Sequence, residues 1–128
     1  MRLLLDTHTL VWAMNDHPRL GEAARSALSS SANQAFVSVA SIWEASIKFR
    51  LGKFPLAAVL LNNPHKVLQS MSIRSLPISL DHARLAGSLA HPHKDPFDRM
   101  LAAQALLEGL TLLSVDAVFD DLPITRLW

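Results

Sequence analysis

The opening segment Met1-Arg2-Leu3-Leu4-Leu5-Asp6 decides the fold class, because Arg2–Leu5 is a short apolar run that ends at a carboxylate. A second run, Leu110–Val115, has the same character and is followed by Asp116. Strands that are apolar on both faces are typical of parallel sheets covered by helices on both sides. We therefore expect both segments to be buried strands of such a sheet.

Further strands and helices alternate between these two runs. β-Favouring residues predict strands at Ala35–Val39 and Ile73–Ile78, with an edge strand at Ile124–Leu127. Helices are predicted at Thr7–Met14, Glu22–Leu28, Ser41–Leu51, Pro55–Leu61, Pro64–Met71, Leu80–Leu89, Phe97–Glu108 and Asp116–Asp121. The alternation predicts an α/β fold: a three-layer sandwich with a central, mostly parallel sheet flanked by helices.

The chain is expected to form one domain that spans residues 1–128. Its 128 residues and 14.1 kDa are close to the commonest domain size. Half of the residues are hydrophobic and 18% are charged, against roughly 25% charged in an average globular domain, which excludes intrinsic disorder. The apolar surplus favours a partner or self-association.

No targeting or disulfide signal is present in the sequence. Apolar runs are much shorter than the ~20 residues that a membrane-spanning helix needs, and Asp6 interrupts the only run resembling a signal peptide. The absence of cysteine excludes disulfides, Fe–S clusters and thiolate zinc sites. We expect a soluble cytoplasmic protein with no membrane partner.

The charges are unevenly distributed although the net charge is only +1. Residues 45–80 contain no Asp or Glu. The same segment carries five cations, Lys48, Arg50, Lys53, Lys66 and Arg74. Such a layout can steer a polyanion toward the protein.

Four carboxylates occupy positions where a parallel sheet would bring them together. Asp6 and Asp116 each follow a strand, Glu44 is predicted in the first turn of the helix after the second strand, and Asp98 in the first turn of the Phe97 helix. Each also has a purely structural interpretation. Asp6 and Asp116 are acceptable helix N-caps, Ser41 and Glu44 fit a capping box, and Glu44 fits an i,i+4 pair with Lys48.

Their convergence is what favours a functional interpretation. Two carboxylates ~5 Å apart repel by about 3 kcal/mol at an effective dielectric of 20, so four in one cleft are costly. A divalent cation removes this cost, and all-oxygen ligation suits Mg²⁺ or Mn²⁺. Such an ion can polarise a phosphate and activate water.

At these residues the sequence resembles the PIN domain, and more narrowly the VapC-type toxins of bacterial toxin–antitoxin pairs. Four linked motifs carry the resemblance from end to end: Leu3-Leu4-Leu5-Asp6-Thr7-His8, Ser41-Ile42-Trp43-Glu44, Asp95-Pro96-Phe97-Asp98-Arg99-Met100-Leu101-Ala102-Ala103-Gln104-Ala105 and Leu112-Leu113-Ser114-Val115-Asp116-Ala117-Val118-Phe119. All four acids keep the order and spacing of the family.

The resemblance implies a metal-dependent endoribonuclease with a PIN-like sandwich fold. Carried over by position, the catalytic metal ligands for Mg²⁺ or Mn²⁺ are Asp6, Glu44, Asp98 and Asp116. Ser114 would stand behind these ligands, near the metal. Asp95 is expected first as a helix cap and second as a ligand. Arg99 would pair with a neighbouring acid or contact phosphate.

The resemblance also implies RNA as substrate, a cognate antitoxin as partner and a homodimer. The expected RNA contacts are the cations that follow Glu44, namely Lys48, Arg50 and Lys53, with a solvated helix face as the alternative. The apolar short helices of Pro55–Met71 are candidates for an antitoxin groove, or pack only within the domain.

Structural roles are expected for several histidine and tryptophan residues. His91-Pro92-His93 is expected to be loop structure rather than a metal site. His8 either lines the cleft or packs beside a helix start. Trp12 and Trp43 are expected as core or interface anchors.

Three other function classes fit the sequence less well. A phosphoacceptor receiver domain is excluded, because no Asp lies between Asp16 and Asp81 and no Lys follows Lys94. A catalytically inactive PIN-like module that only binds RNA or a partner is disfavoured by the intact acids. A metal phosphodiesterase acting on DNA or a 5′ flap shares the same chemistry, although the small size leaves little room for flap-clamping elements.

Overall fold

The computed structural model describes all of residues 1–128 and contains one five-stranded sheet. The strands are β1 (Arg2–Leu5), β2 (Gln34–Ser38), β3 (Ile73–Leu76), β4 (Thr111–Leu113) and β5 (Arg126–Leu127). Their order in the sheet is β3-β2-β1-β4-β5, and every neighbouring pair is parallel. The α/β sandwich is confirmed, and the sheet is parallel throughout.

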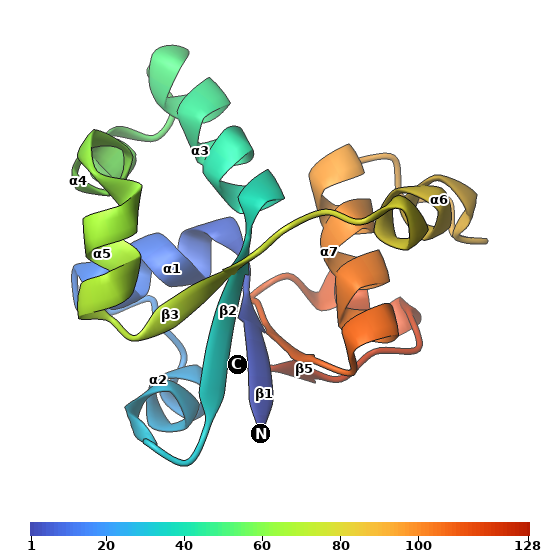
Figure 1. The fold of residues 1–128 in the computed structure, drawn as a ribbon, viewed down its shortest axis with the longest axis horizontal. Coiled ribbons are helices and arrows are strands. Elements are labelled where there is room, and N and C mark those ends of the chain that lie inside the picture. Colours follow the sequence, from blue (N-terminus) through green and yellow to red (C-terminus); the bar gives the residue numbers. More distant parts are fainter.

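Helices cover both faces of this sheet. The α-helices are α1 (Thr7–Met14), α2 (Glu22–Ser29), α3 (Val39–Arg50), α4 (Ala58–Asn62), α5 (Pro64–Ser70), α6 (Leu80–Ser88) and α7 (Pro96–Glu108). Two 3₁₀ turns, η1 (Pro55–Ala57) and η2 (Ala117–Asp121), complete the chain. Figure 1 shows α1 to α5 on one side of the strands and α6 and α7 on the other, which gives the three layers.

The leucines of β1 connect the two halves of the core. Leu3 and Leu5 belong to the larger hydrophobic cluster, under α1 to α5, whereas Leu4 belongs to the smaller one, under α7. All three side chains are fully buried. Because successive side chains of a strand point to opposite faces, an uninterrupted leucine run fits only a strand covered on both sides.

Predicted element ends agree with the structure to within two residues, and the start of α3 shows how a shift of two residues matters. It begins at Val39, because the Ser38 hydroxyl caps it by accepting a hydrogen bond from the backbone N–H of Ala40 at 3.1 Å. The alternative interpretation of Ser41 and Glu44 as a capping box is therefore wrong. Ser41 lies inside the helix, is buried, and its hydroxyl has no hydrogen-bond partner.

The C-terminal residue packs back onto the loop before α2. A Cβ placed on Gly21 would lie 2.6 Å from the carbonyl carbon of Trp128. The Trp128 ring in turn lies 5.8 Å from that of Trp12. None of the helices is both long and apolar enough to cross a lipid bilayer.

Candidate active site

The four predicted carboxylates meet at the carboxyl edge of the sheet. Asp6, Glu44, Asp98 and Asp116 line one cavity of about 230 Å³, together with Asp95. From β1 the chain continues to β2 and β3 on one side, and β4 and β5 pair on the other. Sites in open parallel sheets form at such a reversal of strand order. The prediction that the four acids share one edge is confirmed.

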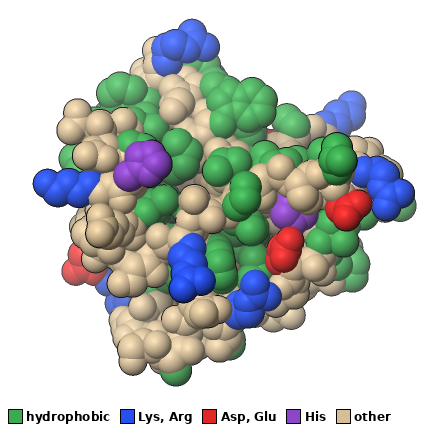
Figure 2. Space-filling view, in the orientation of Figure 1, with side chains coloured by type: hydrophobic (Ala, Val, Ile, Leu, Met, Phe, Trp, Pro, Cys, Tyr) green, Lys and Arg blue, Asp and Glu red, His purple; other side chains and the backbone are tan.

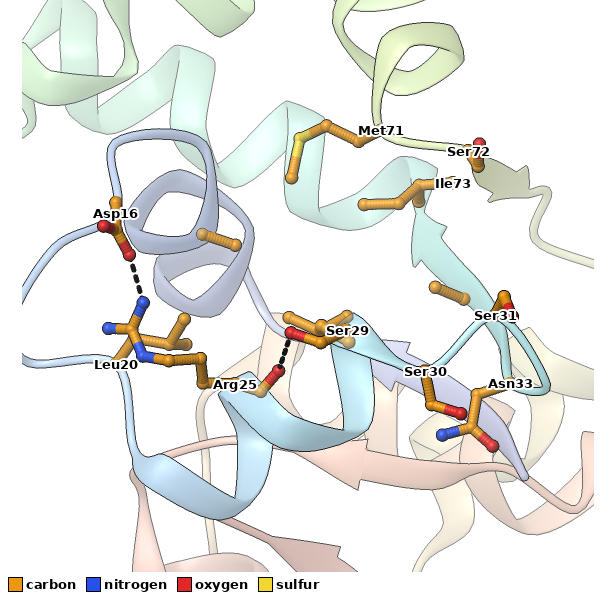
Figure 3. A pocket seen from close by; sticks show the side chains of 13 residues that line it. Asp16, Leu20, Arg25, Ser29, Ser30, Ser31, Asn33, Met71, Ser72 and Ile73 are labelled. Carbon is orange, nitrogen blue, oxygen red and sulfur yellow. Dashed lines mark hydrogen bonds and ion pairs between the residues drawn. The ribbon is translucent and has the colours of Figure 1, made fainter.

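Larger cavities lie elsewhere and lack this chemistry. One of about 550 Å³ lies beside α2 and the start of β3, and Figure 3 shows that the ion pair of Asp16 with Arg25 and a row of serines line it. Another of about 570 Å³ lies between α3 and α5 and is largely apolar. Only the smallest of these three cavities gathers several carboxylates.

Asp6 joins β1 to α1. Its Oδ1 accepts hydrogen bonds from the backbone N–H and the hydroxyl of Thr9, at 2.8 and 2.7 Å. The Thr9 hydroxyl also lies 2.8 Å from the carbonyl of Leu113 in β4. The N-cap interpretation of Asp6 is thus confirmed, and the same carboxylate lines the cavity.

Glu44 is the most buried of the four acids, with 7% of the residue exposed. Its Oε1 accepts a short hydrogen bond from the Thr7 hydroxyl, and its Oε2 lies 3.0 Å from Lys48 Nζ. Because α3 begins at Val39, Glu44 lies in the second turn rather than the predicted first turn. The predicted i,i+4 pair with Lys48 is present.

Asp98, in the first turn of α7, is half-buried, and its Oδ2 lies 2.8 Å from Nε2 of His93. Burial raises the pKa of Asp98 from its usual 3.8 to about 6. The hydrogen bond from His93 opposes this rise in pKa, whereas the charges of Asp95 and Glu44 add to it. The cavity thus disfavours the negative charge of Asp98, mainly because burial removes water from the carboxylate and to a smaller extent because other acids lie near it.

Asp116 and Asp95 both cap helices at the rim. Asp116 is exposed, and its Oδ1 accepts from the backbone N–H of Val118 at 3.0 Å at the start of η2. Ser114 is fully buried, and its hydroxyl accepts from the backbone N–H of Asp116 at 3.1 Å. Asp95 caps α7 by accepting from two backbone N–H groups, as predicted, and also lines the cavity.

Arg99 does not have the environment expected for it. It forms no ion pair with an acid. Its guanidinium donates instead to the backbone carbonyls of five residues at the end of α6 and in the following loop, namely Ala86, Gly87, Leu89, His91 and His93. Arg99 therefore organises the loop before α7. Sequence reasoning missed this, because carbonyl partners leave no mark in the sequence.

His8 both lines the cavity and packs. Its ring lies 4.6 Å from that of Phe54 and 5.4 Å from that of Trp12. Burial lowers the pKa of His8, against the raising effect of nearby Asp6. Trp12 is buried in the core, whereas Trp43 is 62% exposed and contacts Phe97 edge-on at 5.1 Å.

The predicted RNA-binding cations are placed differently from one another. Lys48 lines the carboxylate cavity and pairs with Glu44. Arg50 ends α3 and Lys53 follows Gly52; both are exposed, and neither lines the cavity.

The donor set suits a hard divalent cation. Carboxylate oxygens dominate the cavity, and no sulfur donor is near, which is the ligand chemistry of Mg²⁺ and Mn²⁺. Although the four carboxylates line one cavity, no three His, Asp or Glu side chains are arranged closely enough to hold a common metal ion. One oxygen of Glu44 pairs with Lys48, and one oxygen of Asp98 is hydrogen-bonded to His93.

Comparison with known proteins shows which proteins share this architecture. No individual curated protein sequence matches the chain. A similar solved structure is VapBC2 from Rickettsia felis bound to a promoter DNA fragment, with 18% identity, a TM-score of 0.69, and coverage of 98% of this chain and 97% of that one. VapC20 from Mycobacterium tuberculosis, described as a sarcin-ricin loop cleaving toxin, has 15% identity, a TM-score of 0.69, and coverage of 96% of both chains. FitAcB from Neisseria gonorrhoeae has 18% identity, a TM-score of 0.63, and coverage of 97% of this chain and 95% of that one. These likenesses show the same fold over almost the whole chain. The PIN domain family model matches residues 3–124. This chain is therefore a member of the PIN domain family.

Proposed function

We propose that this chain is a Mg²⁺- or Mn²⁺-dependent endoribonuclease, formed by a single catalytic domain, and the toxin of a toxin–antitoxin pair. The observation that carries the proposal is the meeting of four carboxylates from separate segments in one cavity at the edge of the sheet. Membership of the PIN family supports it, as does similarity in fold to VapC20, which is described as a sarcin-ricin loop cleaving toxin.

In this proposal Asp6, Glu44, Asp98 and Asp116 hold the metal. The ion, when bound, supplies Lewis-acid activation of the phosphodiester and of the attacking water. The protein contributes orientation: hydroxyls of two buried threonines, Thr7 and Thr9, donate to Glu44 and Asp6 respectively. Ser114 positions the turn that carries Asp116, and Asp95 fixes the start of α7 just before Asp98.

The RNA phosphates would be bound by the α3 basic cluster, defined as Lys48, Arg50 and Lys53. Lys48 is the member nearest to the reaction because it lines the cavity. If Glu44 bound a metal ion, the ammonium group of Lys48 would be free to contact a phosphate. Contacts of this kind give affinity without sequence preference.

Two protein partners belong to the proposal, a cognate antitoxin and a second copy of the chain. Exposed apolar surface supports both partners, since Trp43 is 62% exposed and Leu80 is 91% exposed. Figure 2 shows hydrophobic side chains gathered on the face that carries α3 and the connection from β3 to α6. The apolar cavity between α3 and α5 adjoins this face through Val39 and Trp43. A cytoplasmic location, where RNA is found, completes the proposal.

The decisive experiment is cleavage of a mixed RNA pool by the purified, partner-free protein. We expect cleavage with Mg²⁺ or Mn²⁺ that stops with EDTA and in the Asp98→Asn variant. Asp81→Asn is the matched control, because Asp81 is an exposed acid in the first turn of α6, outside the cavity. If folded protein cleaves neither the pool nor RNA from its own host, the catalytic proposal is wrong and an inactive binding module replaces it.

A further inference from the structure

We propose that His93 is a positioning residue that orients the Asp98 carboxylate, and that Arg99 acts on the same carboxylate by holding His93 in place. This inference rests on the proposed function, in which Asp98 is a metal ligand. The contact itself is direct: Nε2 of His93 lies 2.8 Å from Oδ2 of Asp98, and 28% and 22% of the two side chains are exposed. An ionised carboxylate can only accept, so the imidazole N–H donates.

A hydrogen bond to one oxygen restrains the rotation of a carboxylate. With Oδ2 held by His93, rotation of the Asp98 side chain would break a short, partly buried, charge-assisted bond. The other oxygen, Oδ1, accepts no hydrogen bond from a protein group. His93 therefore leaves Oδ1 as the oxygen of Asp98 that is free to bind a metal.

The backbone around His93 is restrained on both sides. Its N–H donates to Nδ1 of His91 at 3.1 Å, and its carbonyl accepts from Nη1 of Arg99 at 3.0 Å. The same Nη1 binds the His91 carbonyl at 2.8 Å. Both backbone polar groups of His93 are therefore hydrogen-bonded, although the residue lies in an irregular loop.

Arg99 anchors this arrangement to α7. Its Nε and Nη2 hold the carbonyls of Ala86 and Leu89 at 2.8 Å, so the end of α6 and the loop are bound to one guanidinium. Arg99 follows Asp98 directly in α7, and its own N–H donates to the Asp95 carbonyl at 3.0 Å. The ligand and the clamp that positions its partner are therefore adjacent residues of one rigid helix.

The chemistry of the side chains explains why these residue types are required. The planar guanidinium offers five N–H donors in a fixed fork, whereas a lysine ammonium is a point charge that cannot reach carbonyls spread from Ala86 to His93. A partner that orients a metal-binding side chain is worth about 10–100-fold in metal affinity when it is lost. The arrangement therefore predicts a measurable effect on metal binding, independent of catalysis.

The test is Mn²⁺ binding to the EDTA-stripped, dialysed protein, measured by titration calorimetry. His93→Leu is expected to weaken Mn²⁺ binding about 10–100-fold, and His93→Gln, whose amide N–H can donate to Asp98, to restore most of the affinity. His65→Leu is the matched control, because His65 is exposed on α5 and does not line the carboxylate cavity. Circular dichroism checks that each variant is folded.

A double variant tests the link through Arg99. Arg99→Lys is expected to weaken Mn²⁺ binding in the wild-type background, but to cause little further loss when combined with His93→Leu, since both changes act through one contact. Independent, additive losses would overturn the role assigned to Arg99. Unchanged Mn²⁺ affinity in His93→Leu, or a His93→Gln variant as weak as His93→Leu, would overturn the role assigned to His93.

Failure of the proposed function gives a different result. If the wild-type protein binds no Mn²⁺, the metal site is wrong, and crystal structures of the wild type and His93→Leu then decide the positioning role. An Asp98 side chain that changes rotamer in the variant supports it. An Asp98 side chain that keeps its rotamer refutes it.

Discussion

Replacing Asp98 by asparagine is expected to stabilise the metal-free protein at pH 7. Burial raises the pKa of Asp98 from 3.8 to about 6, so at pH 7 the folded protein holds an ionised carboxylate that its surroundings disfavour. Asparagine has nearly the same shape, and its carbonyl oxygen can still accept the hydrogen bond from His93. The substitution therefore removes the unfavourable charge and keeps the contact.

The size of the effect follows from the pKa difference. A change from 3.8 to about 6 corresponds to roughly 3 kcal/mol at 1.36 kcal/mol per pH unit. Because 22% of the side chain remains exposed, solvent screening reduces this to about 1–2 kcal/mol. For a domain of this size that is an increase in Tm of about 4–8 °C.

The direction of the pKa shift of Asp98 also determines how the free energy of unfolding depends on pH. Between pH 4 and 6 the folded protein binds more protons at Asp98 than the unfolded chain, so its free energy of unfolding falls as the pH rises. The stability advantage of the Asp98→Asn variant should thus be largest above pH 6 and shrink toward pH 4.

Thermal and urea unfolding in EDTA from pH 4 to pH 8 measure this difference. Asp81→Asn, in which an exposed acid is lost, reports the general effect of removing one negative charge. An Asp98→Asn variant that is less stable than the wild type at pH 7, or a difference that does not change with pH, would refute the electrostatic reasoning.

Three further predictions concern the rest of the molecule. Gly21→Ala should destabilise the fold by about 1–3 kcal/mol, because the new Cβ would lie 2.6 Å from the Trp128 backbone; an unchanged urea midpoint would contradict this packing. Replacing the whole α3 basic cluster by alanine should weaken RNA binding to the cleavage-deficient Asp98→Asn protein and flatten its salt dependence, as measured by fluorescence anisotropy, whereas an unchanged slope assigns the cluster to a solvated helix face. Trp43→Ser should shift a homodimer toward monomer in sedimentation experiments, and a wild-type protein that is already monomeric would remove the dimer from the proposal.

The sheet and the positions of the acids could be predicted because they depend on local patterns. A strand with an uninterrupted run such as Leu3–Leu5 must be buried on both faces, and parallel strands bring their carboxyl ends to one edge. Asp6 and Asp116 follow β1 and β4, which are neighbours in the sheet. Their meeting in one cavity thus follows from strand order together with strand direction.

Local partners of the acids, such as Lys48 for Glu44, could be predicted, whereas partners that depend on the path of a loop or on the exact start of a helix could not. The predicted start of α3 is wrong by two residues: Ser38 and Ser41 are both plausible caps in sequence, and only the end of β2 decides between them. The contact of His93 with Asp98 exists because Arg99 binds loop carbonyls, which every residue possesses. Hydrogen bonds to backbone carbonyls have no residue-type signature.

The structural and catalytic interpretations of the acids are not alternatives. Asp6 and Asp116 both cap a helical turn with one oxygen, and both line the cavity. The two roles need different properties of the side chain. A cap needs an acceptor oxygen, which asparagine also provides, whereas a metal site needs the negative charge.

Substitution by alanine removes both properties at once, so a loss of activity in such a variant confounds a weakened helix start with a lost ligand. Substitution by asparagine removes only the charge. At this edge of the sheet the amide variants therefore separate folding from chemistry, and they do so because the same carboxylates that begin the helices also form the site.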